Sequence, residues 1–276
     1  TELLPPQQLV VANGWIEGTT VGSIILGVLL GGALVSPRVS TALLGFDLPG
    51  FDTGIDTPPE AAIAIIAVFY AIAAIFNWHI PDTGVDHRTP SRNPIALIRE
   101  FSHCVYLLWR DKLGQITLAT TTLFWGAGAT LQFIVLKWAE ESLGMNLSQG
   151  AILQAVVAVG IAVGAVVAAT KVTLPQAASI LPVGVAMGLI VMVLAMYSRD
   201  MGPHGGFALA LFGKSFTVPW YVVVASGILM VVGCLAGFFV VPMNALLQHR
   251  GHVLMGAGHS IAVQNFNENL AILAML

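Results

Sequence analysis

The residues best suited to chemistry lie near the end of the chain, in the run GAGHSIAVQNFNENLAILAML. Glu268 follows Gln264 by four residues, so the two share one face of a helix. Asn265, Asn267 and Asn269 bring the total to five polar side chains within six residues, which cannot all face lipid. An ionisable group inside a bilayer costs about 2.5–3.5 kcal/mol on insertion scales. The run therefore predicts either a polar, substrate-facing path or hydrogen bonds that fix neighbouring helices.

Other polar side chains occur singly or in pairs within apolar segments. Glu17 follows Asn13 by one helical turn, and Trp125 and Gln132 lie about two turns apart on one face. Hydrogen bonding between helices or at the membrane surface explains such residues as well as substrate contact does. The complete candidate substrate-binding set is Glu17, Trp125, Gln132, Gln154, Asn244, Gln264, Asn265 and Glu268.

Signatures of soluble enzymes are missing from the sequence. There is no P-loop, Rossmann glycine fingerprint, HExxH zinc motif or GxSxG nucleophile motif. The histidines show no metal-binding spacing, and the cysteines, Cys104 and Cys234, are far apart. No cluster of Lys and Arg alternates with aromatic residues, as nucleic-acid binding would require. We expect a protein that is not an enzyme, with no catalytic residues, metal, cofactor or nucleic-acid partner.

The composition places these polar residues in a membrane protein. Hydrophobic residues make up 57% of the chain and charged residues 9%, with a mean hydropathy of +0.85, whereas soluble domains are roughly a quarter charged. A bilayer requires runs of about 20 apolar residues. The sequence predicts an all-α, polytopic transmembrane helical bundle with about seven spans, at 10–36, 61–79, 115–138, 149–170, 175–198, 219–246 and 256–276.

A long polar connection at 80–114 separates two groups of spans. It predicts that residues 1–79 end an N-terminal helical half and that residues 115–276 form most of a C-terminal half. Within the connection, the segment from Pro94 to Lys112 spaces its apolar residues at helical intervals. This pattern favours an amphipathic helix at the membrane surface, with an ordinary loop helix as the alternative.

Glycine pairs spaced four residues apart recur in several predicted spans. In lipid no hydrophobic force drives helices together, so association depends on the close backbone approach that small residues permit. Static packing and sliding of helices during transport both fit this pattern. Two prolines, Pro182 and Pro242, lie within apolar spans and predict kinks. The glycine pairs are Gly18/Gly22, Gly27/Gly31, Gly160/Gly164, Gly184/Gly188 and Gly233/Gly237.

Several long strings closely resemble the bacterial lysophospholipid transporter family of the major facilitator superfamily. They are VVANGWIEGTTVGSIILG, TTLFWGAGATLQF, AVVAVGIAVGA, GFFVVPMNALLQHRG and GAGHSIAVQNFNEN. The resemblance implies a major-facilitator-type fold, with this chain as a fragment that covers the fifth to the eleventh of twelve helices. It also implies that 80–114 is the central cytoplasmic connection.

The resemblance implies transport of lysophospholipids, especially lysophosphatidylethanolamine, from the outer to the inner leaflet of the bacterial inner membrane for reacylation. Moving a 16-carbon acyl chain into water would cost about 13 kcal/mol, at about 0.8 kcal/mol per CH₂. The acyl chain should therefore stay in lipid or in an apolar groove, and only the head group needs a polar path. The family pattern has an arginine where this chain has Gln132, which puts a simple phosphate clamp there in doubt.

Two alternatives to this function stay open. One is a different major facilitator carrier, such as a drug/proton antiporter that exports amphipathic molecules. The other is the membrane module of a larger lipid-remodelling enzyme, with an acyltransferase or acyl-carrier-protein synthetase as partner or fused domain. Catalytic domains after the last span of the full-length protein would distinguish the second alternative.

Lys and Arg are more frequent in alternate connections between the spans. Seven fall in the second, fourth and sixth connections, against four in and beside the first, third and fifth. Positively charged loops stay in the cytoplasm. The bias predicts that 80–114 and 247–255 are cytoplasmic and that 37–60 and 199–218 are periplasmic.

Impermeant thiol labelling of intact cells tests this topology. In a chain whose own cysteines are replaced by serine, Thr53→Cys should react from outside and Ser91→Cys should be protected, because only the first lies in a predicted periplasmic loop. Labelling of Ser91→Cys with protection of Thr53→Cys would invert the topology.

Overall fold

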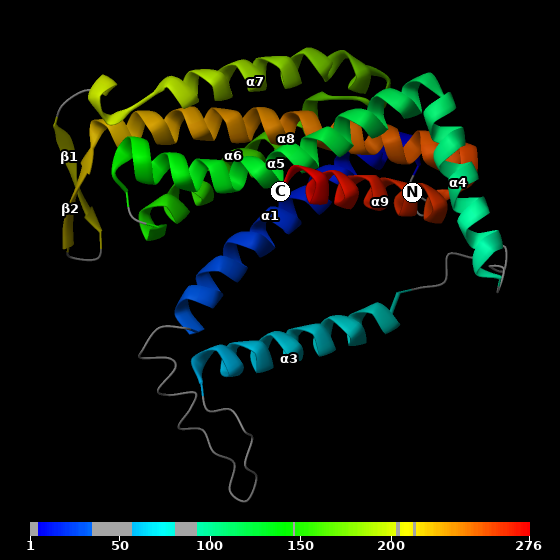
Figure 1. Cartoon of the computed structure of the whole chain (residues 1–276), viewed down its shortest axis with the longest axis horizontal. Helices are drawn as coiled ribbons and strands as arrows, with labels where there is room; N and C mark the ends of the chain where they lie inside the picture. The colour runs from blue at the N-terminus through cyan, green and yellow to red at the C-terminus, as the bar shows by residue number, and fades with distance from the viewer. Residues whose placement is uncertain (1–4, 35–56, 81–92, 146, 203–204, 212–213) are drawn as a thin grey trace, which may run out of the picture. The chain divides into compact units, whose positions relative to one another are not determined.

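Long α-helices make up most of the described chain in the computed structural model (Figure 1). The structure describes residues 5–34, 57–80, 93–145, 147–202, 205–211 and 214–276. The helices are α1 (Leu9–Leu34), α3 (Pro58–Trp78), α4 (Pro94–Arg110), α5 (Lys112–Leu143), α6 (Leu147–Lys171), α7 (Leu181–Met196), α8 (Trp220–Met255) and α9 (Ala257–Met275). Short 3₁₀ helices cover Pro6–Gln8, Leu174–Ile180 and Arg199–Met201.

The long helices confirm the prediction of an all-α, multi-pass membrane protein. Five of the described segments are long and apolar enough to cross a membrane: Glu60–Trp78, Lys112–Leu143, Ile152–Lys171, Leu174–Met196 and Trp220–Met255. The other two predicted spans coincide with α1 and α9, and α9 contains the polar run. The count of seven spans therefore stays a prediction.

The predicted loop at 199–218 contains regular secondary structure. The segment 199–218 contains a strand β1 (Gly206–Leu211) that pairs antiparallel with β2 (Lys214–Pro219), with Gly206 opposite Pro219. Ladder hydrogen bonds between the strands satisfy backbone groups that an irregular loop would leave to water. This hairpin is the exception to an all-α fold in the part of the chain that the structure describes.

Residues 247–255, predicted to connect two spans, are helical. Helix α8 continues through this segment to Met255 and ends at Gly256, whose φ of 88° breaks the helix. Its 36 residues reach about 54 Å at 1.5 Å per residue, well beyond the roughly 30 Å hydrocarbon core. At least one end of α8 therefore extends beyond a core of that thickness. Of the two prolines, Pro242 lies inside α8, while Pro182 lies in the first turn of α7.

The chain divides into two compact units, residues 1–21 with 88–276, and residues 22–87. In the smaller unit, α3 begins at a capping box, in which the backbone N–H of Thr57 donates to Glu60 Oε2 at 2.9 Å. The larger unit contains α4 to α9. Division of the protein into transporter halves at 80–114 stays a prediction. Thr53 and Ser91 lie outside the described residues.

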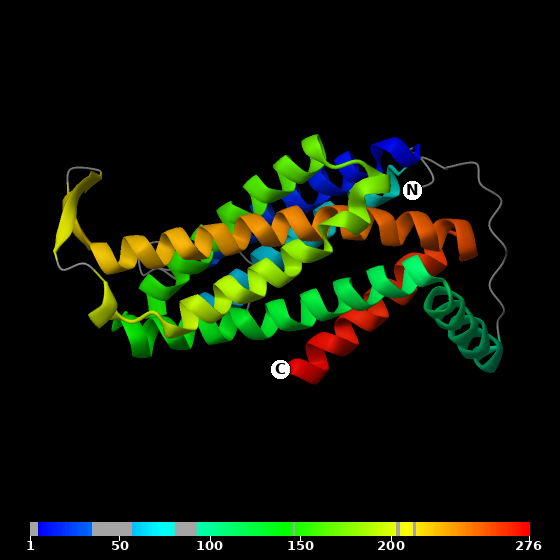
Figure 2. The same ribbon diagram turned by 90° about the horizontal axis from the view of Figure 1, so that it is seen from above.

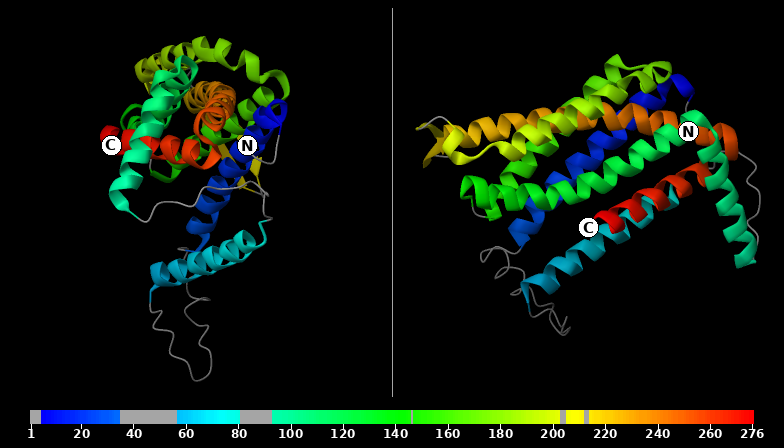
Figure 3. Two further views of the ribbon diagram at one scale, coloured as in Figure 1. Left: turned by 90° about the vertical axis from the view of Figure 1, so that its right-hand side faces the viewer. Right: turned by 45° about the horizontal axis from the view of Figure 1, so that its top comes forward.

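In the larger unit, α8 packs against α6, with α5, α7 and α9 also in contact with it (Figure 2). Helix α4 forms as predicted, and the Asn93 side chain caps it by accepting from the Ile95 N–H at 3.1 Å. Figure 3 shows α4 running across the end of the bundle, beside the junction of α8 and α9. This position fits the predicted surface helix.

Glycines hold α6 and α8 together. A Cβ at Gly164 would lie 2.8 Å from the Cys234 carbonyl carbon, and a Cβ at Gly237 would lie 2.8 Å from the Ala165 nitrogen. Added Cβ atoms at Gly160 and Gly233 would likewise overlap backbone carbonyl oxygens of the facing helix. The predicted close approach of backbones is confirmed for these two glycine pairs.

The other glycine pairs pack less closely. A Cβ at Gly184 would meet the Phe239 ring at 3.1 Å, a side-chain contact rather than a backbone contact. Among the described residues, no atom lies within 4 Å of a Cβ built at Gly18 or Gly188. The four-residue spacing therefore marks a helix interface in α6 and α8 but not in every helix that has it.

Substitutions at these glycines test the packing. Gly160→Leu or Gly237→Leu should sharply reduce the amount of folded, membrane-inserted protein, because the new side chain must push backbone away from backbone. Gly188→Leu is the matched control, since its position is exposed and open. Size-exclusion profiles and thermal unfolding in detergent measure the effect. Normal behaviour of both interface variants would disprove the close packing.

Candidate functional site

A buried polar cluster joins α8 to α9. Gln264 Nε2 donates to Asn244 Oδ1 at 3.2 Å and to Glu268 Oε1 at 2.9 Å. Asn244 is 8% exposed and Gln264 is 7% exposed, while Glu268 is partly buried. A carboxylate and two amides thus form one hydrogen-bonded group, and the predicted pairing of Gln264 with Glu268 is confirmed.

The cluster lies away from the α8–α9 junction. Asn244 lies 11 residues before the end of α8, and Glu268 lies 11 residues after the start of α9. Both positions are about 17 Å from the junction, at 1.5 Å per residue. Both residues fall in segments that the sequence predicts as membrane spans, 219–246 and 256–276.

Helix α1 contacts α8 one turn beyond the cluster. Asn13 is buried, and its Nδ2 donates to Gln248 Oε1 at 3.1 Å and to the Leu9 carbonyl at 2.9 Å. Gln248 follows Asn244 by one turn of α8, so the two share one face. Glu17 follows Asn13 by one turn of α1 and is partly buried. Of the predicted site residues, Asn244, Gln264 and Glu268 are joined by hydrogen bonds, while Glu17 lies on α1.

Gln132 and Gln154 form a separate pair between α5 and α6. Gln132 Nε2 donates to Gln154 Oε1 at 3.4 Å, and Gln154 Nε2 donates to the Gln132 carbonyl at 2.8 Å. Gln132 lies 20 residues after the start of α5, about 30 Å along the helix. The pair is therefore nearer the opposite end of the bundle from the α8–α9 junction.

Trp125 has an unused hydrogen-bond donor. Its Nε1 is buried and has no hydrogen-bond partner among the described residues, and the same holds for Thr122 Oγ1 three residues earlier. The Trp125 ring packs edge-on against Phe124, with centroids 5.8 Å apart. Buried donors are almost always paired, so these two groups are available to a polar ligand or to water.

The five polar side chains of the α9 run divide between two faces of the helix. Gln264 is buried, whereas Asn265 and Asn269 are exposed. Asn269 Nδ2 donates to the Asn265 carbonyl at 2.7 Å, and Asn267 Nδ2 donates to the Val263 carbonyl at 2.8 Å. Consecutive residues of a helix point about 100° apart. Asn265 is thus separated from the Gln264–Glu268 face.

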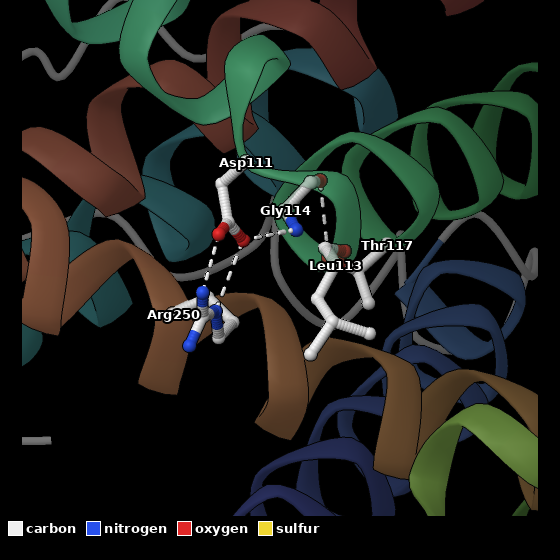
Figure 4. A network of polar contacts seen from close by, with 5 residues as sticks. All are labelled: Asp111, Leu113, Gly114, Thr117 and Arg250. Atoms are coloured by element: carbon white, nitrogen blue, oxygen red, sulfur yellow. Dashed lines mark hydrogen bonds and ion pairs between the residues drawn. The ribbon is translucent and has the colours of Figure 1, made fainter.

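An ion pair joins the start of α5 to the end of α8 (Figure 4). The Arg250 guanidinium donates to both carboxylate oxygens of Asp111, with Nε at 3.0 Å from Oδ2. The same Oδ2 accepts from the Gly114 N–H at 2.8 Å and so caps α5. A Cβ at Gly114 would lie 2.8 Å from the Leu108 carbonyl oxygen. The bidentate geometry is the strong form of an Arg–carboxylate contact.

The ion pair changes the titration of Asp111. Hydrogen bonding to Arg250 holds the pKa of the Asp111 carboxyl below its ordinary value of 3.8, burial opposes this, and the Gly114 N–H adds to the lowering. The charged pair is therefore fully formed at neutral pH. Sequence reasoning missed this contact, because the partners are 139 residues apart and each looked like an ordinary loop charge.

The described part of the chain holds no group of three or more His, Cys, Asp or Glu side chains that could bind a metal ion. Cys104 is buried in α4, where burial raises the pKa of its thiol. Cys234 lies in α8, and both cysteines are free.

The whole chain is similar to curated bacterial transporters. The lysophospholipid transporter LplT of Serratia proteamaculans (strain 568) is 36% identical over 276 residues, which is 100% of this chain and 59% of that protein. The LplT proteins of Yersinia enterocolitica and Yersinia pestis (strain Pestoides F) are 37% identical over 276 residues, or 58% of their length. The chain thus spans less than two thirds of these relatives. No family model and no solved structure matches it.

Removing the ion pair should destabilise the larger unit. Asp111→Asn should lower the free energy of unfolding at neutral pH by about 1–2 kcal/mol, between the values for exposed and buried pairs. Chemical denaturation in detergent measures this. Glu140→Gln, in an exposed contact with Lys137, is the control and should change it by less than about 1 kcal/mol.

The pH dependence has a defined sign. Because the Asp111 pKa is lowered in the folded protein, the stabilisation is complete above the ordinary value of 3.8 and is lost as the pH falls through the folded value. The difference between wild type and Asp111→Asn should therefore be constant near neutral pH and shrink below 3.8. A difference that grew on acidification would contradict the ion-pair assignment.

Proposed function

We propose that this chain, which belongs to the bacterial lysophospholipid transporter family, carries part of the path by which lysophospholipids cross the membrane. The substrate class is lysophosphatidylethanolamine, moved from the outer to the inner leaflet of the bacterial inner membrane for reacylation. The protein acts as a secondary transporter and catalyses no covalent reaction.

The observation that carries this proposal is the hydrogen-bonded Asn244–Gln264–Glu268 cluster, which lies in predicted membrane spans. Burying an ionisable group in a spanning helix is costly, and such groups normally face a polar path or a partner. Glu268 keeps part of its surface open while Gln264 holds one of its oxygens. A carboxylate that is fixed yet accessible can receive a cationic group that passes through the bundle.

The cluster matches the chemistry of an ethanolamine head group. The Glu268 carboxylate can accept hydrogen bonds from the substrate ammonium, while amide N–H groups can donate to its phosphate. Helix α9 contains neither Lys nor Arg, and Arg250, the one such residue in α8, is held by Asp111. The phosphate would therefore meet N–H donors of neutral side chains rather than a fixed cation. The Gln132–Gln154 pair and the Trp125 indole supply further donors of this kind.

The two alternatives receive less support. The relatives are named as lysophospholipid transporters and not as drug carriers. The names of these relatives also give no support to a fused or partner acyltransferase or acyl-carrier-protein synthetase. The proposal therefore keeps lysophospholipid as the substrate and requires no enzyme domain.

Uptake of lysophosphatidylethanolamine tests the proposed function. The full-length protein is expressed in spheroplasts that lack their own transporter, and the conversion of labelled substrate to diacyl lipid is followed. Conversion should depend on the protein, because only lipid in the inner leaflet is reacylated. Drug efflux from the same cells is measured in parallel. Efflux without lysophospholipid uptake would replace the proposal with the antiporter alternative.

The charge of Glu268 should matter for transport. Glu268→Gln preserves shape and removes the charge, so uptake normalised to membrane-inserted protein should fall about tenfold or more, the equivalent of about 1.4 kcal/mol. Glu268→Leu should fall further, since Gln264 then loses a hydrogen-bond acceptor.

An exposed carboxylate provides the control for this prediction. Glu141 contacts Lys137 at the end of α5, with its side chain 66% exposed, and Glu141→Gln should leave uptake unchanged. If Glu268→Gln transported normally while Glu268→Leu merely reduced the protein level, the cluster would be a packing device and not part of the path.

A further inference from the structure

An apolar groove lies where α4 meets α9, outside the polar cluster. Its volume is about 660 Å³, within the range of small-molecule binding sites. The Phe101 ring of α4 packs edge-on against the Phe266 ring of α9, with centroids 5.1 Å apart, and forms the floor where the two helices touch. The residues that line this α4–α9 groove are Leu97, Ile98, Phe101, Ser102, Val105 and Phe266.

We propose that the α4–α9 groove binds the acyl chain of a lysophospholipid at the predicted cytoplasmic end of the bundle. This inference rests on the proposed function and adds a second substrate contact to it. The polar cluster receives the head group during passage, whereas the groove holds the hydrocarbon chain of the substrate at the inner leaflet.

The position of α4 sets the depth of the groove. Helix α4 runs across the bundle end, beside the α8–α9 junction (Figure 3). It exposes Tyr106 and Trp109, the aromatic types that favour the membrane–water interface. Arg110 contacts Tyr106, with its guanidinium carbon 5.9 Å from the ring centroid. A groove bounded by such a helix opens at the level where acyl chains meet head groups.

Charges around the groove are complementary to a phospholipid head group. Arg99 lies on α4 next to the lining residue Ile98, Arg110 is the last residue of α4, and Lys112 is the first residue of α5. All three are exposed. An acyl chain in the groove would thus place its phosphate near cations that α4 presents to the surface.

The groove continues along α9. A second hollow of about 380 Å³ is lined by Asn265, Phe266, Asn269, Leu270 and Leu273, so the two share Phe266. From Leu273 to Phe266 is seven residues, about 10 Å along the helix. The two hollows follow the exposed side of α9 toward α4, with amide groups along one edge. The first hollow is bounded by α4 and α9 and the second by α9 alone, and their apolar lining suits the acyl chain of the proposed substrate.

The α4–α9 contact does not depend on the groove lining alone. His259 Nε2 lies 3.8 Å from Glu100 Oε1, which joins the start of α9 to α4. Cys104 and Leu108 pack into the core with Leu118, Leu247 and Val263. Ser102 is exposed, so a substitution at this lining residue can fill the groove without removing the contacts that fix α4.

Photolabelling of the full-length protein in lipid nanodiscs tests the inference. The probe is lysophosphatidylethanolamine with a diazirine near the end of its acyl chain, and adducts are mapped by mass spectrometry. Adducts should form on the peptides that contain Phe101 to Val105 and Phe266. Unlabelled lysophosphatidylethanolamine should suppress them, whereas the diacyl lipid of the nanodisc, present in large excess, should not prevent them.

A pair of variants in α4 makes the test specific. Ser102→Trp fills the groove and should reduce the adducts about tenfold. This change corresponds to about two CH₂ groups of the acyl chain that are no longer buried. His103→Trp, at an exposed position of α4 that does not line the groove, is the matched control and should label like wild type. A chromatographic profile of each variant confirms that it is folded.

The outcomes separate this inference from the proposed function. Normal uptake without groove adducts, or equal labelling by a diacyl probe, would overturn the groove as a lysophospholipid site and leave the transporter function intact. Blocked labelling because another part of the full-length chain covers the groove would also overturn the groove as a lysophospholipid site and leave the transporter function intact. Absence of uptake with wild-type protein would instead refute the proposed function itself.

Discussion

The arrangement of this protein depends on the absence of a hydrophobic force between helices in lipid. Lipid tails solvate apolar side chains as well as another helix does, so two apolar helices associate only through close packing and polar contacts. The interface of α6 and α8 supplies close packing, since Gly160, Gly164, Gly233 and Gly237 let backbone touch backbone. A side chain at any of these positions would hold the helices apart.

This interface leaves the rest of α8 free to carry polar groups. Its first half is occupied by glycine contacts with α6, and its second half turns Asn244 toward α9 and Gln248 toward α1. The Asp111–Arg250 pair then fixes the end of α8 to the start of α5. Helix α8 is thus the element through which packing, the polar cluster and the terminal ion pair are connected.

Much of the helical arrangement could be predicted from sequence, because hydropathy, helical periodicity and small-residue spacing are local signals. They identified the long helices, the surface helix α4, the glycine interface and the shared face of Gln264 and Glu268. Contacts between distant segments could not be predicted, as in the pairing of Asn13 with Gln248. The extension of α8 to Met255 was missed because the charge of Arg250 suggested a turn, although no helix-breaking conformation occurs before Gly256.

The central claim is that the polar face of α9 contacts the substrate head group, and one labelling measurement tests it most directly. Gln264→Cys in the otherwise cysteine-free, full-length protein is treated with a thiol-reactive analogue of the lysophospholipid head group, with and without lysophosphatidylethanolamine. The account predicts reaction at this position and protection by the lipid, whereas Val193→Cys, on the exposed side of α7, shows no protection. Failure of the lipid to protect Gln264→Cys, when the same protein transports, would contradict it.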